Sequence, residues 1–410
     1  MSTSRFTGIE VGPPIEIFAL NKIYTDDSFE QKVNLTIGAY RTNDGKPWVL
    51  PVVKKVEKLL AHDELQNHEY LPVLGLDAFS KSAVEMLLGK KSSSIIEGRA
   101  FGVQCLSGTG SLRVGAEFLS RILKYDTVYY SSPSWENHRL IFVNGGFKNT
   151  HEYRYWNQTG RNIDFDGMIE DLSNASENSV VILHACAHNP TGCDPTPEQW
   201  MKIADVIEEK KLFTFFDSAY QGFATGNLEN DAFAVRLFAE RGIEFFCAQS
   251  FAKNFGLYNE RAGNLVVHMN NTNEVIQTKS QLTLIVRGMY SNPPNHGARI
   301  VATVLGNEDL YEEWKDHIRT MSGRIKEMRK ALYDHLVSLK TPGNWEHILN
   351  QIGMFSYTGM SERQVEYLKS HYHIYMPRSA RMNMCGLNEK NVEYVANAFN
   401  KAVNEFPHNV

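Results

Sequence analysis

The stretch Ser250-Phe-Ala-Lys-Asn-Phe-Gly-Leu-Tyr-Asn-Glu-Arg-Ala-Gly263 lies between two short apolar runs, each of which predicts a buried strand. Its lysine, Lys253, therefore stands on a loop between two buried elements. A lysine amine becomes a nucleophile when desolvation or nearby cations lower its pKa, and it then condenses with carbonyl groups. The hydroxyl of Ser250 and the guanidinium of Arg261 suit a phosphate ester. A lone lysine on a loop is more often only solvated, so the rest of the chain must decide.

Polar side chains follow neighbouring apolar runs just before this stretch. Three runs predict buried strands: 180–185, 212–216 and 244–249. A predicted helix over 195–211 joins the first two runs into a βαβ unit. Asn189, Asp217 and Ser250 each follow one of the runs, and ligands of such sheets bind where the strands end. The pattern therefore predicts a site at which these three side chains converge.

A strand predicted over 103–106 leads into Ser107-Gly-Thr-Gly110, and a helix is predicted over 111–123. A turn of small residues at a helix N-terminus exposes N–H groups and the positive end of the helix dipole, which favours a phosphate. Such junctions are common in any α/β protein, so this one is weak evidence alone. Its value rises because Ser250 and Arg261 suit the same group.

Composition and charge narrow the class of protein. The 410 residues are 42% hydrophobic and 22% charged, and this length predicts two or three domains. The net charge of -5 is not the signature of a polyanion-binding protein, so we expect no nucleic-acid partner. We expect no membrane association, because no apolar run approaches the roughly 20 residues needed to span a bilayer and the N-terminus lacks the apolar core of a secretory signal. The five cysteines lie mostly in apolar runs, which indicates reduced thiols in the cytosol.

The two ends of the chain predict a second, smaller domain. Prolines make 11–18 an extended arm, and 33–41 is predicted as a strand. From Trp314 onward the apolar spacing predicts one long amphipathic helix, which would connect two domains. A strand over 353–357 and a terminal helix over 388–403 would complete the smaller domain.

The fourteen-residue stretch as a whole resembles the lysine motif of the class I, fold-type I aminotransferases, and the resemblance runs from Pro13 to the last predicted helix. It implies an α/β fold, with a large domain whose mostly parallel sheet is flanked by helices and a smaller α+β domain. Residues 1–45 would form an N-terminal arm and part of the small domain. Residues 46–313 would form the large cofactor-binding domain, and 314–410 the long connecting helix and the rest of the small domain. The implied cofactor is pyridoxal 5'-phosphate, held as a Schiff base on Lys253.

The resemblance gives roles to the polar residues near the predicted strand ends. Asp217 would keep the pyridine nitrogen of the cofactor protonated, and Tyr220 and Asn189 would bond to its phenolate oxygen. Trp135 would stack on the ring. Without the lysine motif, Asp217 would be taken for a turn or helix-capping residue and Trp135 for a packing residue. The residues assigned to the phosphate are Ser107, Gly108, Thr109, Ser250, Arg261 and, from a second subunit, Tyr70.

Three histidines lie near the same predicted strand ends: His138, His184 and His188. A structural histidine with satisfied ring nitrogens is the usual case at such positions. The resemblance places His138 and His184 behind Asp217, where they would support its carboxylate. It also makes the bonds Ser132–Pro133 and Asn189–Pro190 candidates for cis peptides. No metal ion is expected.

Substrate choice rests on two arginines. Arg381 matches the family position that binds the α-carboxylate, although Arg378 lies only three residues away. Gly38, Trp135 and Asn189 would lie in the same substrate site. Arg287, at the predicted start of a helix, matches the residue of the partner subunit that clamps a distal carboxylate; a surface cation is the plainer interpretation. The resemblance thus implies a homodimer with shared active sites, acting on amino acids and 2-oxo acids. The implied reaction converts aspartate and 2-oxoglutarate to oxaloacetate and glutamate.

Two stretches, 47–53 and 135–138, resemble the cytosolic branch of the family rather than the mitochondrial one. Two alternatives remain open. An enzyme of the same fold that acts on aromatic amino acids or kynurenine is disfavoured by Arg287. A protein that has lost catalysis and serves as a scaffold is disfavoured by the presence of Lys253, Asp217 and Arg381.

Overall fold

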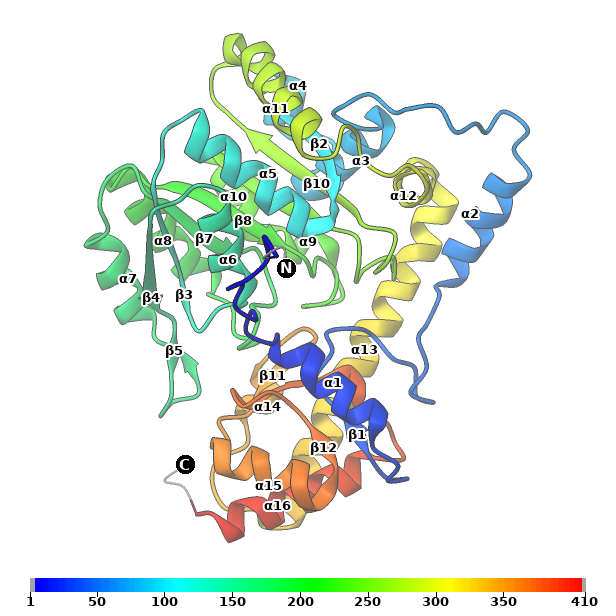
Figure 1. The fold of residues 1–410 in the computed structure, drawn as a ribbon, viewed down its shortest axis with the longest axis vertical. Helices are drawn as coiled ribbons and strands as arrows, with labels where there is room; N and C mark the ends of the chain where they lie inside the picture. Colours follow the sequence, from blue (N-terminus) through cyan, green and yellow to red (C-terminus); the bar gives the residue numbers. More distant parts are fainter. Residues whose placement is uncertain (1–3, 408–410) are drawn as a thin grey trace.

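The computed structural model describes residues 4–407. It has a large lobe built around a sheet and a small lobe that combines an N-terminal segment with the C-terminal part of the chain (Figure 1). The long helix α13 (Glu308–Ser338) runs from one lobe into the other. One continuous apolar core surrounds this helix and extends from Val301 in the large lobe through Trp314 and Leu336 to Phe399 in the small lobe. The predicted long connecting helix is therefore present.

Seven strands form the central sheet of the large lobe. Only β10 runs antiparallel to its neighbours, so the sheet is mostly parallel, as the sequence predicts. Apolar cores cover both faces. The order across the sheet is β2 (Ala100–Leu106), β10 (Ala262–His268), β9 (Phe245–Ser250), β8 (Phe213–Ser218), β7 (Val180–His184), β3 (Thr127–Ser132) and β4 (Asn149–Arg154).

Helices flank this sheet, and local sequence fixes several of their ends. In α8 (Pro197–Glu209) a capping box joins Thr196 and Gln199, and proline occupies the first helical position, where its missing N–H costs nothing. The other helices of the large lobe are α2 (Pro51–Ala61), α3 (Asp77–Leu88), α4 (Ser93–Ile96), α5 (Ser107–Arg121), α6 (Asn137–Asn144), α7 (Phe165–Ser173), α9 (Leu228–Asp231), α10 (Phe233–Glu240), η1 (Thr272–Glu274), α11 (Val275–Met289) and α12 (His296–Gly306).

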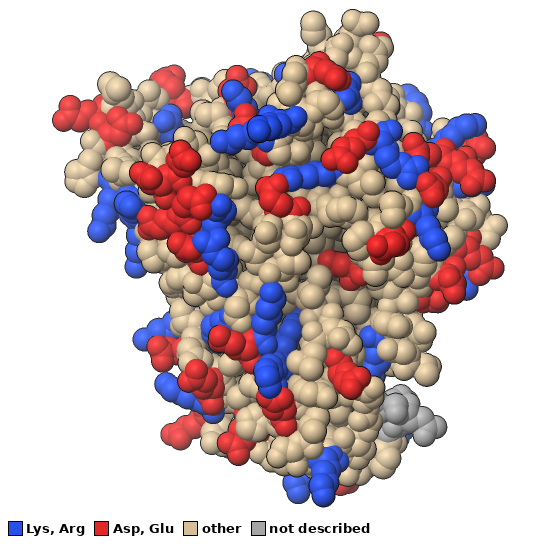
Figure 2. Space-filling view, turned by 180° about the vertical axis from the view of Figure 1, so that it is seen from behind, with Lys and Arg blue, Asp and Glu red and all other residues tan. Residues whose placement is uncertain are grey.

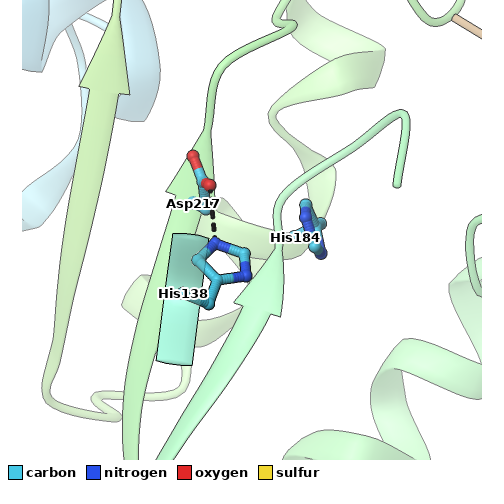
Figure 3. Close-up of side chains that lie close together, drawn as sticks. All are labelled: His138, His184 and Asp217. Carbon is cyan, nitrogen blue, oxygen red and sulfur yellow. Dashed lines mark hydrogen bonds and ion pairs between the residues drawn. The ribbon is translucent and has the colours of Figure 1, made fainter. Parts of the chain in front are cut away.

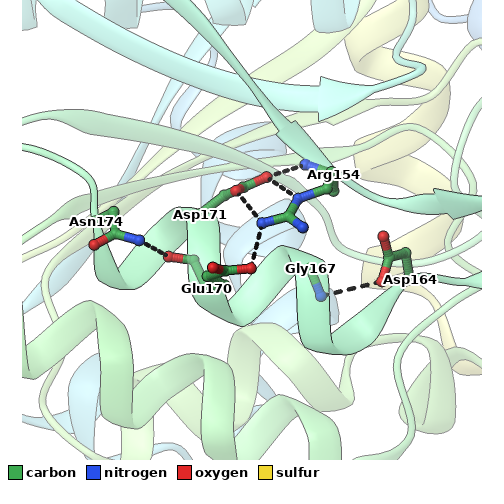
Figure 4. A network of polar contacts seen from close by, with 6 residues as sticks. All are labelled: Arg154, Asp164, Gly167, Glu170, Asp171 and Asn174. Atoms are coloured by element: carbon green, nitrogen blue, oxygen red, sulfur yellow. Dashed lines mark hydrogen bonds and ion pairs between the residues drawn. The ribbon is translucent and has the colours of Figure 1, made fainter.

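At the end of strand β4, Arg154 bonds to two acidic side chains of α7 (Figure 4). Its Nη2 lies 2.7 Å from Glu170 and 2.6 Å from Asp171. At the start of the same helix, Asp164 accepts a hydrogen bond from the Gly167 N–H at 3.1 Å. These contacts orient α7 on the sheet, although such an exposed ion pair adds about 1 kcal/mol or less to stability.

The small lobe combines segments from both ends of the chain. Strand β1 pairs in parallel with β12, and β11 pairs antiparallel with β13. The two-stranded hairpin β5 (Trp156–Asn157) and β6 (Asn162–Ile163) belongs to the large lobe. The small-lobe elements are α1 (Glu16–Asp26), β1 (Val33–Asn34), α14 (His347–Asn350), β11 (Phe355–Tyr357), α15 (Glu362–Tyr372), β12 (Ile374–Tyr375), β13 (Arg381–Asn383), η2 (Met384–Gly386) and α16 (Val392–Glu405).

Two predictions for the N-terminal segment are partly wrong. The arm predicted over 11–18 is non-helical only up to Ile15, because α1 begins at Glu16, directly after the two prolines. The strand predicted over 33–41 is paired as a strand only at Val33 and Asn34. Leu35 still bonds to the main chain of Tyr375 and Asn383, but from Thr36 onward side chains replace a neighbouring strand, since the Asn383 amide donates to the carbonyls of residues 37 and 39.

Several helix boundaries also differ from the prediction, and the terminal helix predicted over 388–403 is α16, Val392–Glu405. Helix α13 begins at Glu308, six residues before Trp314, because Asn307 caps its N-terminus. Helix α5 begins at Ser107, so the predicted turn is its first turn. Arg287 lies in the last turn of α11 and does not open a helix; a separate helix, α12, begins only at His296.

Within residues 4–407 no helix is both long enough and apolar enough to cross a membrane. Acidic and basic side chains are interspersed over the face shown in Figure 2. All five cysteines are free thiols, and four of them are buried.

The domain boundaries expected from the sequence, which divide the chain into 1–45, 46–313 and 314–410, stay predictions.

Candidate active site

The buried carboxylate of Asp217 lies at the end of β8 and is held by a histidine. Nε2 of His138 donates to Oδ2 of Asp217 at 2.9 Å, and the Ser134 hydroxyl lies 2.9 Å from Nδ1 of the same ring. His184, at the end of β7, is paired in register with Asp217. Figure 3 shows the second carboxylate oxygen directed away from His138, so it is available to another partner.

The charge state of this group follows from its contacts. Burial raises the pKa of Asp217, but the hydrogen bond from His138 and the positive charge of nearby groups, Lys253 included, outweigh burial and bring the pKa below its usual value. Burial and the neighbouring His138 lower the pKa of His184 to about 3. Asp217 is therefore an anion at neutral pH and His184 a neutral ring.

The same three side chains have the spacing of a metal site, because their ligand atoms lie within 4.8 Å of one another. One carboxylate oxygen of Asp217 is already engaged by His138, however. Neither ring nitrogen of His184 has a hydrogen-bond partner within the described residues. The expectation of no metal ion stays a prediction, and the hydrogen-bonded pair supports it.

The amine of Lys253 lies 5.1 Å from the centre of the Tyr220 ring. Part of the lysine side chain remains accessible. Desolvation, with the positive charges of Arg261 and Arg381, lowers the pKa of Lys253, although Asp217 acts in the opposite direction. Burial raises the pKa of Tyr220, which keeps its hydroxyl protonated as a hydrogen-bond donor. A lowered pKa is what the predicted role of Lys253 requires, and that role stays a prediction.

A set of donors suited to a phosphate lies where α5 begins beside the end of β9. The hydroxyls of Ser107 and Ser250 lie 3.0 Å apart, and the Ser107 N–H donates to the carbonyl of Arg261 at 3.0 Å. Gly108 lies against the side chain of Ser250, and Thr109 follows in the first turn of α5. The structure therefore brings together five of the six residues predicted to hold the phosphate.

Arg381 is buried at the start of β13 and reaches the large lobe. Its Nη1 donates to Oδ1 of Asn189 at 3.2 Å and its Nη2 to the carbonyl of Thr36 at 2.8 Å, while its Nε has no partner within the described residues. The face of the Phe355 ring lies 4.2 Å below the guanidinium. Gly38 is needed here, because a Cβ at that position would come within 2.8 Å of the Phe355 ring.

The remaining predicted residues fall into two groups. Trp135 is partly buried beside the site, with its ring edge-on to His138 at 5.3 Å. Tyr70 and Arg287 are exposed, and neither contacts the residues around Lys253; Arg287 bonds to Ser291 of its own helix end. Arg378, the alternative to Arg381, is exposed as well.

Sequence reasoning missed two side chains that shape the site. Phe355 supports Arg381, but a phenylalanine in a short strand gives no signal beyond burial. Ser134 holds His138 and could have been found, since it lies four residues before that histidine at the start of a helix. His188 is a structural histidine, because both of its ring nitrogens have partners. They lie 2.8 Å from the hydroxyls of Ser131 and Thr191. Both predicted cis peptides, Ser132–Pro133 and Asn189–Pro190, are present.

A cavity of 950 Å³ lies between α3, α10 and the start of α13, but none of the predicted site residues lines it. The chemistry of the side chains therefore identifies the site better than the size of a cavity does.

The side chains around Lys253 fit pyridoxal phosphate. The carbonyl of Arg261 accepts from the N–H of Ser107, whose hydroxyl lies 3.0 Å from that of Ser250, and no carboxylate contributes to the pKa of Arg261, so this corner suits an anion and not a cation. The amine of Lys253 suits an aldehyde carbon, and the free oxygen of Asp217 suits a protonated ring nitrogen. The fold and this set of donors define a pyridoxal-phosphate-dependent enzyme built on a mostly parallel sheet.

Comparisons with known proteins agree. Residues 30–399 match the family model described as aminotransferase class I and II. The cytoplasmic aspartate aminotransferase of Caenorhabditis elegans is 53% identical over 99% of this chain and 100% of its own length. The solved aspartate aminotransferase from Saccharomyces cerevisiae cytoplasm has a TM-score of 0.95 and 46% identity, over 98% of this chain and 99% of that one. An aromatic-amino-acid aminotransferase of Burkholderia pseudomallei, solved covalently bound to pyridoxal phosphate, has the same TM-score but 38% identity, over 98% and 100% of the two chains.

The chain belongs to the class I and II aminotransferases. Enzymes of this family act on amino acids and 2-oxo acids and depend on pyridoxal phosphate. The two solved structures have equal TM-scores, so the fold alone does not decide the substrate.

Proposed function

We propose that this chain transfers the amino group between L-aspartate and 2-oxoglutarate, giving oxaloacetate and L-glutamate. One observation carries the proposal: within the described residues, the buried guanidinium of Arg381 bonds only to the neutral acceptors Asn189 and Thr36, and its positive charge helps to lower the pKa of Lys253. A charged carboxylate forms a stronger hydrogen bond with a guanidinium than a neutral oxygen does. The relative with 53% identity carries the same activity in its name.

Bound pyridoxal phosphate supplies an electron sink for the electrons released at the substrate Cα. The chain's own residues supply the rest. Lys253, with its lowered pKa, takes the proton from Cα and returns it as a general base and acid. Asp217 keeps its negative charge through the His138 hydrogen bond and so holds a proton on the ring nitrogen. Tyr220 remains protonated and, together with Asn189, would donate a hydrogen bond to the ring's phenolate oxygen.

Other residues would orient the cofactor and the substrate. Gly108 and Thr109 would bring N–H groups to the phosphate and Ser107 and Thr109 hydroxyls, where Ser250 and Arg261 would add a hydroxyl and a charge. Trp135 packs against the ring face. Arg381 and Asn189 bind the α-carboxylate, and Gly38 leaves room beside them.

We infer that the active site is shared between two copies of the chain. Tyr70 is 87% exposed and Arg287 is exposed too, so neither serves the site of its own chain. The segments that carry them are tied together, because the Asn292 amide donates to the Leu71 carbonyl at 3.2 Å. Because the two segments are connected, Tyr70 and Arg287 could reach the active site of a partner subunit together. Tyr70 would then bind the partner's phosphate and Arg287 the distal carboxylate of the partner's substrate.

The N-terminal segment supports the homodimer. Its large apolar side chains have no cover in a single chain: Phe6 is 77% exposed, Val11 98% and Phe18 68%. A contiguous set of exposed apolar side chains marks an interaction surface. In a dimer with two-fold symmetry, each copy of the chain would cover this segment of the other copy.

We propose a cytoplasmic location, because the relatives named above are cytoplasmic and the five thiols are unpaired. Aromatic amino acids are the second candidate substrates, since the aromatic enzyme has an equal TM-score. Arg287 favours dicarboxylates over them, because an apolar side chain would leave its charge without a partner.

An absorption spectrum of the purified protein tests the proposed function. The holoprotein should show a bound chromophore that changes with pH, and adding L-aspartate alone should bleach it to the amine form. L-Phenylalanine at the same concentration should bleach it far more slowly. A chromophore that aspartate leaves unchanged would favour the scaffold, and faster bleaching by phenylalanine would favour the aromatic enzyme.

A further inference from the structure

Among residues 4–407, only main-chain carbonyls form hydrogen bonds with the buried guanidinium of Arg329 in α13, and its Nε has no partner there. Its Nη1 donates to the carbonyl of Ile348 at 3.0 Å, and its Nη2 donates to the carbonyls of Gly353, at 2.9 Å, and Phe355. No carboxylate contributes to its pKa, which burial lowers to about 10, so the guanidinium remains charged at neutral pH. A buried charge without a counter-ion is costly to keep. Its contacts should therefore explain why it is there.

The backbone that Arg329 holds supports the guanidinium of Arg381. Strand β11 begins at Phe355 and pairs with β13, where Tyr357 lies opposite Arg381. The Phe355 ring lies 4.2 Å from that guanidinium and also contacts Gly38. A shift in the carbonyl of Phe355 would therefore move the ring on which the substrate-binding arginine rests.

The same backbone supports the loop that carries Asn189. The Ile352 N–H donates to the Gly192 carbonyl at 2.7 Å. Gly192 has a φ of +67°, and a Cβ added there would lie 2.7 Å from the Phe355 carbonyl, the same oxygen that Arg329 binds. Arg329 and Gly192 thus lie at the same carbonyl, that of Phe355. Gly192 is three residues after Asn189 in the loop.

We propose that Arg329 is a positioning residue for the substrate α-carboxylate. By binding three carbonyls between residues 348 and 355, it fixes the Phe355 ring beneath Arg381 and the loop that holds Asn189. It acts through these residues and does not touch the substrate. The planar fork of a guanidinium spans several carbonyls at once, which the single ammonium of a lysine does not. The inference rests on the proposed function, since it concerns the same carboxylate site.

The test compares Arg329→Met and Arg329→Lys with the wild-type holoprotein. Maleate, an unreactive dicarboxylate, is titrated by calorimetry, and KM and kcat are measured for L-aspartate. Misplacing a binding group by about 1 Å costs up to about a hundredfold, so we expect maleate to bind about ten- to a hundredfold more weakly to Arg329→Met. Arg329→Lys should fall between Arg329→Met and wild type. KM should rise with maleate's dissociation constant, while kcat changes far less and the cofactor absorption keeps its position.

Arg324→Lys is the matched control, because Arg324 lies on the same helix and also donates to carbonyls, those of Thr42 and Leu387. It should bind maleate as the wild type does. Unchanged maleate binding in a folded Arg329→Met, or an equal loss in Arg324→Lys, overturns the proposal. If both Arg329 variants unfold while the control folds, Arg329 serves stability only and the proposal is rejected. Wild type that binds no maleate rejects the proposed function instead.

Discussion

Nη1 of Arg381, in the small lobe, donates to Oδ1 of Asn189, in the large lobe, across 3.2 Å. The two residues lie 192 positions apart in sequence. An α-carboxylate that binds Arg381 would meet the Asn189 amide at once, so the substrate is expected at the contact between the two lobes.

Asp217 should be needed as a carboxylate at its present distance from His138. Asp217→Ala should weaken cofactor binding and slow turnover on the order of 10²- to 10³-fold, because the ring nitrogen loses its charge partner. Asp217→Glu keeps the charge and should be far milder. Turnover and cofactor affinity are measured for both. If the two variants behave alike and both stay active, Asp217 is only a turn residue.

Removing the His138 donor should change how stability depends on pH. In wild type the pKa of Asp217 lies below its usual value, so its contribution to stability is present above the unfolded pKa, near 3.8, and is lost only as the pH falls through the lower, folded value. In His138→Phe burial is no longer opposed by this bond, and the folded pKa of Asp217 should rise above the unfolded one. The ionised carboxylate then destabilises the variant as the pH rises through that value.

The measurement is urea unfolding of the cofactor-free protein at pH 5 and pH 8. The difference in unfolding free energy between wild type and His138→Phe should be larger at pH 8. Ser134→Ala, which removes only the contact to Nδ1, serves as a milder control. A difference that is the same at both pH values contradicts the account of the Asp217 charge.

Arg287 should act as a filter for dicarboxylates. Arg287→Ala should reduce kcat/KM for aspartate and glutamate, since a charge-assisted bond is worth about 1.5–3 kcal/mol, or roughly ten- to a hundredfold. The values for alanine and phenylalanine should change little. Steady-state kinetics with the four amino acids decide the matter. An equal loss for all four would indicate a damaged fold rather than a lost filter.

Hybrid dimers should reveal a shared site. Lys253→Ala and Arg287→Ala should each be nearly inactive toward aspartate as homodimers. In a hybrid, one site carries both lesions, and the other combines an intact Lys253 with the intact Arg287 of the opposite chain. Random mixing makes about half of the dimers hybrid, so activity should recover to roughly a quarter of wild type.

The hybrids carry two different tags, and pull-down with both confirms that they formed. If Lys253 and Arg287 of one chain served the same site, every site in a hybrid would carry a lesion. Confirmed hybrids without recovered activity would rule out the shared site.

The parts of the fold that sequence predicted best depend on local patterns. Apolar runs locate β7, β8 and β9, and their ends place Asp217 and Ser250 correctly, because strand ends follow from hydrophobicity alone. The long helix α13 follows from the spacing of its apolar residues. The role of Lys253 needed the whole fourteen-residue stretch, since a single lysine on a loop is ambiguous.

The parts that sequence missed depend on distant partners. Residues 35–41 look like a strand, yet their carbonyls bond to Asn383 and Arg381, more than 340 positions away. The support that Phe355 gives to Arg381 appears only when two short strands pair. Tyr70 and Arg287 have no visible role within the described residues of a single chain, and the ligands proposed for them would belong to another copy.

The most direct test of the central claim follows the nitrogen atom itself. L-Aspartate labelled with heavy nitrogen is mixed with 2-oxoglutarate and the holoprotein, and the products are identified by mass spectrometry. We predict that the label appears in glutamate with one oxaloacetate formed for each, and that Lys253→Ala loses this transfer by a factor of about 10²–10⁴ or more, the usual contribution of a general base. Unlabelled glutamate, label released as ammonia, or wild-type rates in Lys253→Ala would contradict the account.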